Sequence, residues 1–294
     1  MSPASFSDPC TQEPRELRSA ALHALIERDP ERKQGTVRAL WTAFAAGAIS
    51  LSPTADLNPA SLSVASQIPG RPTRPELVPP SALLRRAMGT VEGRAIGLHA
   101  LAHIEFNAIN LALDAIWRFA GLPPDYYADW LRVAAEEALH FDLLARHLQS
   151  QGYAYGDFPA HNGLWEMAER TADDVLSRMA LVPRTLEARG LDASPQVRAK
   201  LWQAGERRAA EILDIILRDE IGHVAIGNRW FAHLCRERSL DPIVTYAELA
   251  ERYRAPRLHG PFNLSARRAA GFSEPELQAL QAAAQPPATN LKPI

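Results

Sequence analysis

The chain carries two Glu-x-x-His motifs in separate helical stretches, Glu137 to His140 and Glu220 to His223. One further glutamate precedes each motif, Glu105 by 32 residues and Glu187 by 33 residues. Residues three apart lie on one face of an α-helix, so the Glu and His of one motif can bind the same ion or adjacent ions. The pattern therefore predicts six metal ligands on four helices.

Repetition gives this pattern its weight. Nine histidines would produce roughly 0.6 accidental Glu-x-x-His matches at ordinary glutamate usage, so the motifs alone are weak. However, 82 residues separate Glu105 from Glu187, and 83 residues separate the two motifs. This repeat predicts two αα-hairpins, each with a Glu on its first helix and Glu-x-x-His on its second. Ferritin-like four-helix bundles with dinuclear metal sites have this ligand order.

The glutamates replace aliphatic residues on apolar helical stripes. The stripe around the first glutamate reads Leu98, Ala102, Glu105, Ile109, Ala112 and Ile116. The stripe around the second motif reads Ile212, Ile216, Glu220, His223 and Gly227. A buried carboxylate is costly unless it is paired or bound to a metal, and four that converge would repel one another without cations between them. The stripes thus support the metal site.

The fourth ligand-bearing helix is the hardest to place. The acidic residues available on it are Glu166, Glu169, Asp173, Asp174 and Glu187. Glu187 is chosen because it continues the apolar stripe through Met179 and Pro183, and Gly190 is expected to cap the helix. Pro183 is expected to kink this helix and widen the bundle, although a break between two shorter helices is an alternative.

Length and composition fit one main domain with appendages. The 294 residues are 47% hydrophobic with a net charge of −2, which suffices for a large core and does not require nucleic acid as a partner. We expect an N-terminal helical and Pro-rich extension over 1–80, the four-helix bundle over 81–236, and a C-terminal extension packed on the bundle over 237–294. The Pro-rich segment 52–80 should wrap the bundle or act as a linker.

Helical periodicity places the individual elements. Within the N-terminal extension, one or two amphipathic helices are expected over 14–48. A capping box that begins at Ser273 should open a final helix. The remaining helices are expected at 81–119, 124–151, 162–189, 195–236 and near 241–253.

The sequence also bears on the compartment. Two cysteines are too few for a disulfide framework, so a reducing compartment is expected. No apolar run approaches the roughly 18 to 20 residues that span a bilayer, and the N-terminus lacks a charged region followed by an apolar stretch. These features predict a soluble, cytoplasmic protein without membrane contact.

Six segments of the chain form a recognisable set: His103-Ile-Glu-Phe, Glu136-Glu-Ala-Leu-His-Phe, Gly163-Leu-Trp-Glu-Met-Ala-Glu, Leu186-Glu-Ala-Arg-Gly-Leu-Asp, Arg218-Asp-Glu-Ile-Gly-His-Val and Pro261-Phe-Asn. They resemble the ferritin-like family known as domain of unknown function 455, and the resemblance runs from about residue 70 to 280. It implies a dimetal bundle with the six ligands named above, and a distant similarity to di-iron carboxylate oxygenases such as a tRNA hydroxylase. It implies no particular reaction.

Other polar residues near the motifs have two interpretations each. His99 and His103 lie four apart on one helix, and a structural or ligand-orienting role is favoured over direct metal binding. Tyr126 and Tyr127 are assigned to packing at a helix start, in preference to a redox role. A surface or capping role is favoured over contact with the ligand histidines for three acids, Asp142, Asp214 and Asp219.

Carboxylate and imidazole ligands suit iron or manganese, so the predicted cofactor is two Fe ions, with Mn or mixed Fe/Mn as alternatives. The leading hypothesis is a non-haem dinuclear oxidoreductase that activates O2 to hydroxylate or oxidise an unidentified substrate, small or RNA-borne. It requires an electron donor protein, allows a homodimer, and predicts a pocket beside the metals lined by 52–80 or the C-terminal extension. No catalytic residue beyond the ligands follows from the sequence.

Two other functions remain open. One is a ferritin-like iron oxidation or storage protein, which the residues outside the bundle would hinder from forming a cage. The other is an RNA-binding or interaction module without catalysis, although a solvated surface is the favoured interpretation of its basic cluster. That cluster comprises Arg252, Arg254, Arg257, Arg267 and Arg268.

Overall fold

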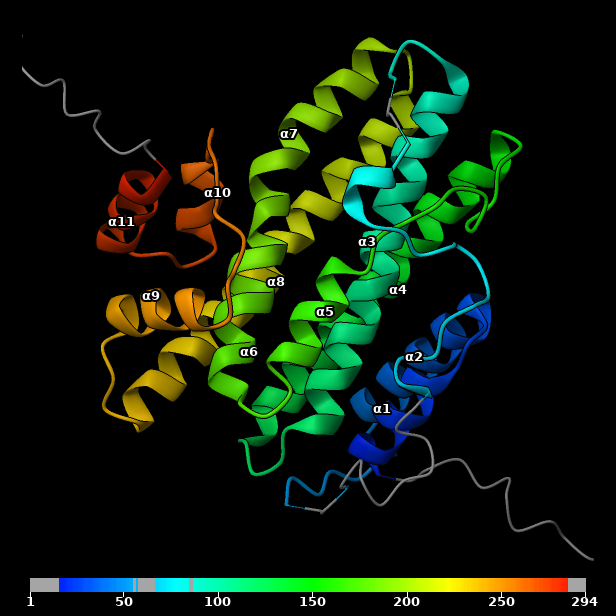
Figure 1. Cartoon of the computed structure of the whole chain (residues 1–294). Helices are drawn as coiled ribbons and strands as arrows, with labels where there is room; N and C mark the ends of the chain where they lie inside the picture. The colour runs from blue at the N-terminus through cyan, green and yellow to red at the C-terminus, as the bar shows by residue number, and fades with distance from the viewer. Residues whose placement is uncertain (1–15, 55–56, 58–66, 85–86, 285–294) are drawn as a thin grey trace, which may run out of the picture. The chain divides into compact units, whose positions relative to one another are not determined.

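The computed structural model describes residues 16–54, 57, 67–84 and 87–284 (Figure 1). These residues form helices and turns with no strand among them, so the predicted all-α bundle is confirmed. Two short helical segments of the described part are of other types than α, namely the 3-10 turn Pro80–Ala82 and the π-helical turn Val182–Glu187, named η4. The helices are α1 Leu17–Ile26, α2 Pro30–Ala45, α3 Val91–Arg118, α4 Pro124–Ser150, α5 Gly163–Arg170, α6 Val175–Leu181, α7 Ala188–Gln203, α8 Arg207–Glu237, α9 Pro242–Arg252, α10 Leu264–Ala269 and α11 Glu274–Ala284.

The described residues form two compact units. The first unit holds those up to Pro72 together with Ala108–Ala138, and the second holds Thr73–Asn107 together with those from Leu139 onward. Helices α3 and α4 each run through both units. The three-part division expected from the sequence stays a prediction.

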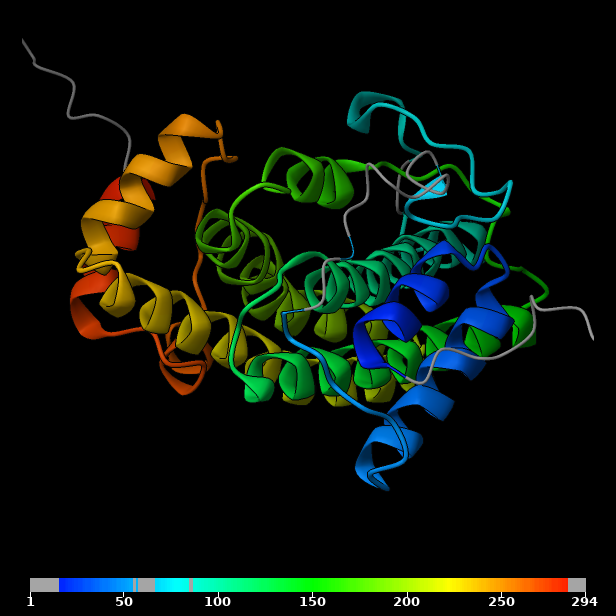
Figure 2. The same cartoon turned by 90° about the horizontal axis from the view of Figure 1, so that it is seen from below.

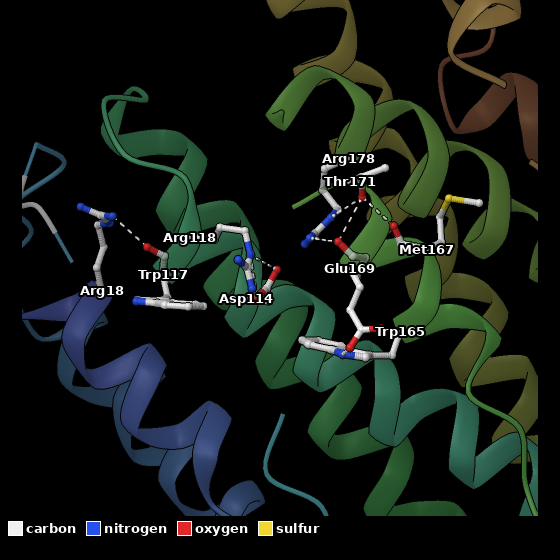
Figure 3. A network of polar contacts seen from close by, with 10 residues as sticks. Arg18, Asp114, Trp117, Arg118, Trp165, Met167, Glu169, Thr171 and Arg178 are labelled. Carbon is white, nitrogen blue, oxygen red and sulfur yellow. Dashed lines mark hydrogen bonds and ion pairs between the residues drawn. The ribbon is translucent and has the colours of Figure 1, made fainter. Parts of the chain in front are cut away.

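In the first unit, α1 and α2 pack as a helical hairpin (Figure 2). The buried Arg18 of α1 donates hydrogen bonds to the carbonyls of Ile116 and Trp117, the latter at 2.8 Å (Figure 3). These carbonyls belong to the last turn of α3 and have no partner within that helix. The guanidinium therefore caps α3 and offsets the negative end of its dipole.

The described residues of the Pro-rich segment contain no α-helix, and backbone hydrogen bonds attach them to other elements. Gly70 donates its N–H to the carbonyl of Leu25 at 2.8 Å, within the first unit. In the second unit, Val78 donates to the carbonyl of Ala160 at 2.8 Å, and Ala160 donates to the carbonyl of Glu76 at 2.9 Å. Residues 55–56 and 58–66 of this segment lie outside the described part.

Two of the predicted helices differ from those in the structure, one at its start and one in its continuity. The helix expected from 81 begins at Val91, because the Thr90 hydroxyl accepts the N–H of Gly93 at 3.0 Å and caps the new helix. The helix expected over 162–189 is divided into α5 and α6, because the carboxylate of Asp174 accepts two N–H groups of the first turn of α6. Buried Arg178 completes the junction by donating to the Ala168 carbonyl near the end of α5. It also donates to the hydroxyl of Thr171 at 3.0 Å, as Figure 3 shows.

The disturbance predicted at Pro183 takes the form of a π-helical turn, not a break between helices. Proline has no N–H to donate, so the regular hydrogen-bond ladder cannot continue through it. The N–H of Ala188 instead bonds to the carbonyl of Pro183, five residues back. The hydroxyl of Thr185 donates to the carbonyl of Ala180 at 2.7 Å, which satisfies an acceptor at the end of α6, just before the disturbed turn. The helix thereby stays continuous from α6 into α7.

The predicted cap at Gly190 is wrong, because α7 continues to Gln203 and α8 begins at Arg207 instead of near 195. Asp192, just after this glycine, accepts hydrogen bonds from the backbone N–H of Asn263 and from the Arg267 side chain. Tertiary contacts therefore hold the chain helical past Gly190. The turn falls at Gly205, whose φ of +84° is the left-handed conformation that glycine adopts without strain.

The C-terminal helices α9, α10 and α11 lie beside α8 and α7 in the second unit (Figures 1 and 2). The capping box is confirmed, because the Glu276 carboxylate accepts the N–H of Ser273 at 2.7 Å and its hydroxyl at 2.8 Å. An apolar cluster joins α10 and α11 to the bundle helices, and it contains Ala188, Leu191, Val224, Ala266, Ala270, Phe272 and Leu277.

Among the described residues, none of the helices combines the length and the apolar character that a membrane crossing requires. The cytoplasmic location stays a prediction.

We expect the substitution Gly227→Ala to destabilise the fold. A Cβ at this position of α8 would lie 2.5 Å and 2.7 Å from the Cβ and Cγ of Pro183, a rigid ring that cannot move aside locally. Overpacking of this kind costs about 1 to 3 kcal/mol. Urea denaturation measures the change in the free energy of unfolding.

Gly190→Ala is the matched control, since no atom lies within 4 Å of the added Cβ and the site is inside α7. It should leave stability unchanged or raise it by up to about 1 kcal/mol, through helix propensity. Equal effects of the two substitutions would contradict the close packing of η4 on α8.

Candidate metal centre

The two stripes predicted to be buried are buried in the structure. Every member of the α3 stripe is less than a tenth exposed, from Leu98 through Glu105 to Ile116. On α8, the stripe that runs from Ile212 to Gly227 is buried throughout, including Glu220 and His223. The helical period therefore assigns the acidic side chains to the interior correctly.

Four of the six predicted ligands come together. Each offers one atom, and these atoms all lie within 4.8 Å of one another. The three glutamates are 3%, 0% and 7% exposed, in the order of the chain, and the histidine is fully buried. The group consists of Glu105 on α3, Glu137 and His140 on α4, and Glu220 on α8.

The imidazole of His140 has a defined orientation. Its Nε2 lies 3.0 Å from Oδ2 of Asp219, and its Nδ1 lies 3.4 Å from Oε2 of Glu105. An ionised carboxylate only accepts hydrogen bonds, so Nε2 carries the proton and donates it. This leaves the lone pair of Nδ1 on the side of Glu105. Ligand atoms that share an ion at about 2.1 Å are roughly 3 to 3.5 Å apart, so the pair fits one ion.

Asp219 is in turn held by Arg218, whose Nε donates to Oδ1 at 2.8 Å. Burial raises the pKa of the Asp219 carboxyl, but the hydrogen bond from His140 and those from Arg218 outweigh burial and hold the pKa well below its usual range. Asp219 is therefore an anion that fixes the tautomer of the candidate ligand His140. Partners of this kind commonly orient metal-binding histidines.

The interpretation of Asp219 as a surface or capping group is wrong. The surface role predicted for the other two acids is confirmed, since Asp142 pairs with Arg146 and Asp214 pairs with Arg198. The missed signal is the interval of four residues from Asp219 to His223, which places the acid beside the ligand face of α8. Which histidine it would contact depends on the packing of α8 against α4.

His223 and Glu187 lie outside the group of four. His223 is buried, its Nδ1 is 3.8 Å from Oε2 of Glu220, and its ring centroid is 5.8 Å from that of His140. Glu187 is half-buried at the end of η4. That turn packs on α8 at Gly227, one helical turn beyond His223. Both residues stay predicted ligands.

His99 and His103 take part in a separate polar network. The N–H of Gly156 donates to Nε2 of His99 at 2.9 Å. Nε2 of His103 donates to the carbonyl of His161 at 3.1 Å, so its Nδ1 accepts the hydroxyl of Tyr155 at 2.9 Å. These contacts hold the connection 152–162 on α3 and support the structural interpretation of both histidines.

The ring of Tyr155 also packs on two phenylalanines, each of which follows a predicted ligand. Its centroid is 5.5 Å from that of Phe106 and 4.9 Å from that of Phe141. Phe106 follows Glu105 and Phe141 follows His140, so the network supports the backbone on which two ligands stand.

The two tyrosines at the start of α4 serve packing, as favoured. Both are fully buried, and the Tyr127 hydroxyl donates to the carbonyl of Phe119 at 2.9 Å and accepts the N–H of Leu122 at 3.2 Å. Tyr127 therefore closes the turn between α3 and α4.

The basic cluster does not form one solvated surface. Arg267 is buried and makes a two-point ion pair with Asp192, at 2.6 and 3.0 Å. Arg268 pairs with Glu274, and Arg257 donates to the carbonyl of Ala283. The favoured interpretation of a solvated face is thus wrong for Arg267.

A buried group of carboxylates and imidazole inside an all-α bundle defines a candidate metal-binding protein. Residues 26–278 match the family described as Protein of unknown function (DUF455), and the chain belongs to this family. An uncharacterised protein of Haemophilus influenzae is 53% identical over 213 residues, which cover 70% of this chain and 74% of the relative. No solved structure matches the chain. The wider similarity to ferritin-like proteins stays a prediction.

The chemistry of the donor set fits a metal ion. Three carboxylates and one imidazole combine hard oxygen donors with a nitrogen donor, a set suited to iron or manganese. Three ionised carboxylates inside 4.8 Å would repel one another in a buried site, and a bound cation offsets that repulsion. The group could therefore hold a metal ion.

We expect Asp219→Asn to weaken metal affinity about 10- to 100-fold, because it removes the negative charge that orients His140. Titration of metal-free protein with Mn²⁺ measures the affinity. Asp214→Asn removes a carboxylate from the same helix at an exposed pair with Arg198, and should bind metal like wild type. Equal affinities of the two variants would contradict the assigned role of Asp219.

The stability of the fold should depend on the protonation of His99. Burial lowers its pKa to about 4, against a smaller opposing effect of Asp157. The unfolded state, with a histidine pKa near 6.5, binds the proton more tightly than the folded state. Stability from this group should therefore be complete above about pH 6.5 and fall as the pH drops toward about 4.

Urea denaturation between pH 6.5 and 4.5 checks this effect. His99→Gln keeps an acceptor for the N–H of Gly156 but does not titrate, so its stability should fall less over this range than that of wild type. His259→Gln, which alters an exposed histidine, should follow wild type. If His99→Gln lost as much stability as wild type between pH 6.5 and 4.5, the pH dependence could not come from His99.

Proposed function

We propose that the chain is a non-haem dinuclear metal oxidoreductase, with two iron ions held by six residues and O2 as the oxidant. The observation that carries the proposal is the convergence of four buried donors from three helices within 4.8 Å. His223, beside Glu220 on α8, and Glu187, at the end of η4, would complete the ligand set. The residues that would hold the ions are Glu105, Glu137, His140, Glu187, Glu220 and His223.

When bound, a pair of reduced iron ions supplies the electrons that O2 takes up as a substrate is oxidised. The chain contributes charge, orientation and shielding. The glutamates balance the charge of the cations, and Asp219 keeps the proton of His140 on Nε2, so that Nδ1 stays available as a donor. Full burial of Glu137 and His140 keeps bulk water from these ligands.

The proposed reaction needs an electron donor protein and a substrate as well as O2. A small organic substrate is favoured over one carried on RNA, because two arginines of the basic cluster are already paired with carboxylates, Arg267 with Asp192 and Arg268 with Glu274. Arg267 in particular is buried against Asp192 and is not available to a phosphate. A homodimer remains compatible with this proposal.

Elemental analysis after expression with added iron is the first test. Wild type should contain about two iron or manganese ions per chain. A double variant, Glu137→Ala with Glu220→Ala, should lose them. The control, Glu248→Ala with Glu251→Ala, removes two exposed carboxylates from α9 and should retain the metal.

Oxygen consumption with a chemical reductant then separates the candidate functions. Metal-dependent O2 uptake with a fixed content of about two ions per chain supports an oxidoreductase. Iron uptake far beyond two ions per chain would instead indicate storage. Folded wild-type protein without stoichiometric metal would overturn the proposal and leave an interaction module.

A further inference from the structure

A cavity of about 280 Å³ lies in the second unit, between η4, α9 and the C-terminal segments. It is at the small end of the range for sites that bind small molecules. Residues of the C-terminal extension line this cavity, but it is not the pocket beside the metals that the sequence predicts, and that pocket stays a prediction. None of the six predicted metal ligands lines it, so it is a separate candidate site.

The walls of the cavity are mostly short and apolar. One wall is α9, with Ala247 and Ala250, and the opposite wall is α11, with Ala279, Leu280 and Ala283. Alanine side chains leave room between the two helices without closing it. The lining therefore suits an apolar body that is narrow enough to lie between α9 and α11.

Arg184 of η4 provides a polar contact in this apolar lining. It is only 5% exposed, and it donates to Oδ1 of Asn228 at 2.8 Å and to Oε1 of Glu276 at 2.5 Å. Its Nε has no hydrogen-bond partner among the described residues. Buried N–H groups nearly always find an acceptor, so this donor indicates a ligand oxygen.

Aromatic rings hold the Arg184 guanidinium in place. The rings of Phe272, Phe231 and Tyr246 lie 4.7, 4.9 and 5.3 Å from its central carbon. A guanidinium held in this way loses little conformational freedom when a ligand binds.

The charged groups that line the cavity are mainly positive. Arg184, Arg257 and Arg267 line it together with one carboxylate, Glu276. Asp192 makes a two-point ion pair with Arg267 and offsets its charge, and Glu276 offsets that of Arg184. The excess positive charge of the lining therefore comes from Arg257, which donates to the carbonyl of Ala283. The balance of charge favours an anionic ligand group over a neutral or cationic one.

We propose that this cavity binds a small monocarboxylate with an unbranched apolar body. The carboxylate accepts a hydrogen bond from Nε of Arg184, and the apolar body lies between α9 and α11. This binding site is independent of the proposed metal chemistry, since its lining contains no predicted metal ligand.

Calorimetric titration of the full chain with decanoate, below its micellar concentration, tests the proposal. Wild type should bind one decanoate per chain. Decanol, which has the same chain and no charge, should bind at least about tenfold more weakly, because hydrogen bonds to charged groups contribute more than neutral ones. Equal affinities for the two probes would refute recognition of the carboxylate by Arg184.

A matched pair of variants tests the location. Ala247→Trp fills the cavity from α9 and should weaken decanoate binding at least about tenfold. Val244→Trp alters a 56% exposed residue of the same helix that does not line the cavity, and it should bind decanoate like wild type. Far-UV circular dichroism checks that both variants are folded.

Arg184→Gln should bind decanoate and decanol with similar affinity. If that variant fails to fold, the Ala247→Trp and Val244→Trp pair still decides the location of the site. Absence of saturable decanoate binding to wild type, or equal binding by Ala247→Trp and Val244→Trp, would overturn the proposal.

Discussion

The convergence of three carboxylates and an imidazole inside the protein constrains the packing of the helices that carry them. Acidic side chains are costly in an apolar interior, so the helices that carry them must supply compensating contacts. α3, α4 and α8 each present the acidic residue on an otherwise aliphatic face.

Support reaches the ligands by two routes. Through side chains, Arg218 holds Asp219, and Asp219 holds His140 with its Nδ1 on the side of Glu105. Through the backbone, the connection 152–162 is fastened to α3 by His99 and His103. The hydrogen-bond partners of each ring distinguish the two roles of histidine here. His140 is a candidate metal ligand, whereas His99 and His103 are structural.

The π-helical turn η4 carries residues of both candidate sites. Pro183 packs on Gly227 of α8, Arg184 lines the C-terminal cavity, and Glu187 ends the turn. Such turns are rare and frequently occur at functional sites, because the altered register redirects side chains. The proline makes the turn necessary, and Thr185 within it satisfies the carbonyl of Ala180 in the preceding helix.

The sequence by itself determined the all-α class, the buried faces of α3 and α8, and the capping box at Ser273. These features follow from the 3.6-residue period and from contacts within a few residues. Only the tertiary structure decided that α7 continues past Gly190, that Asp219 reaches His140, and that an arginine-lined cavity forms under α9. Each of these depends on contacts between residues distant in the chain, such as Asp192 with Arg267, which local periodicity does not encode.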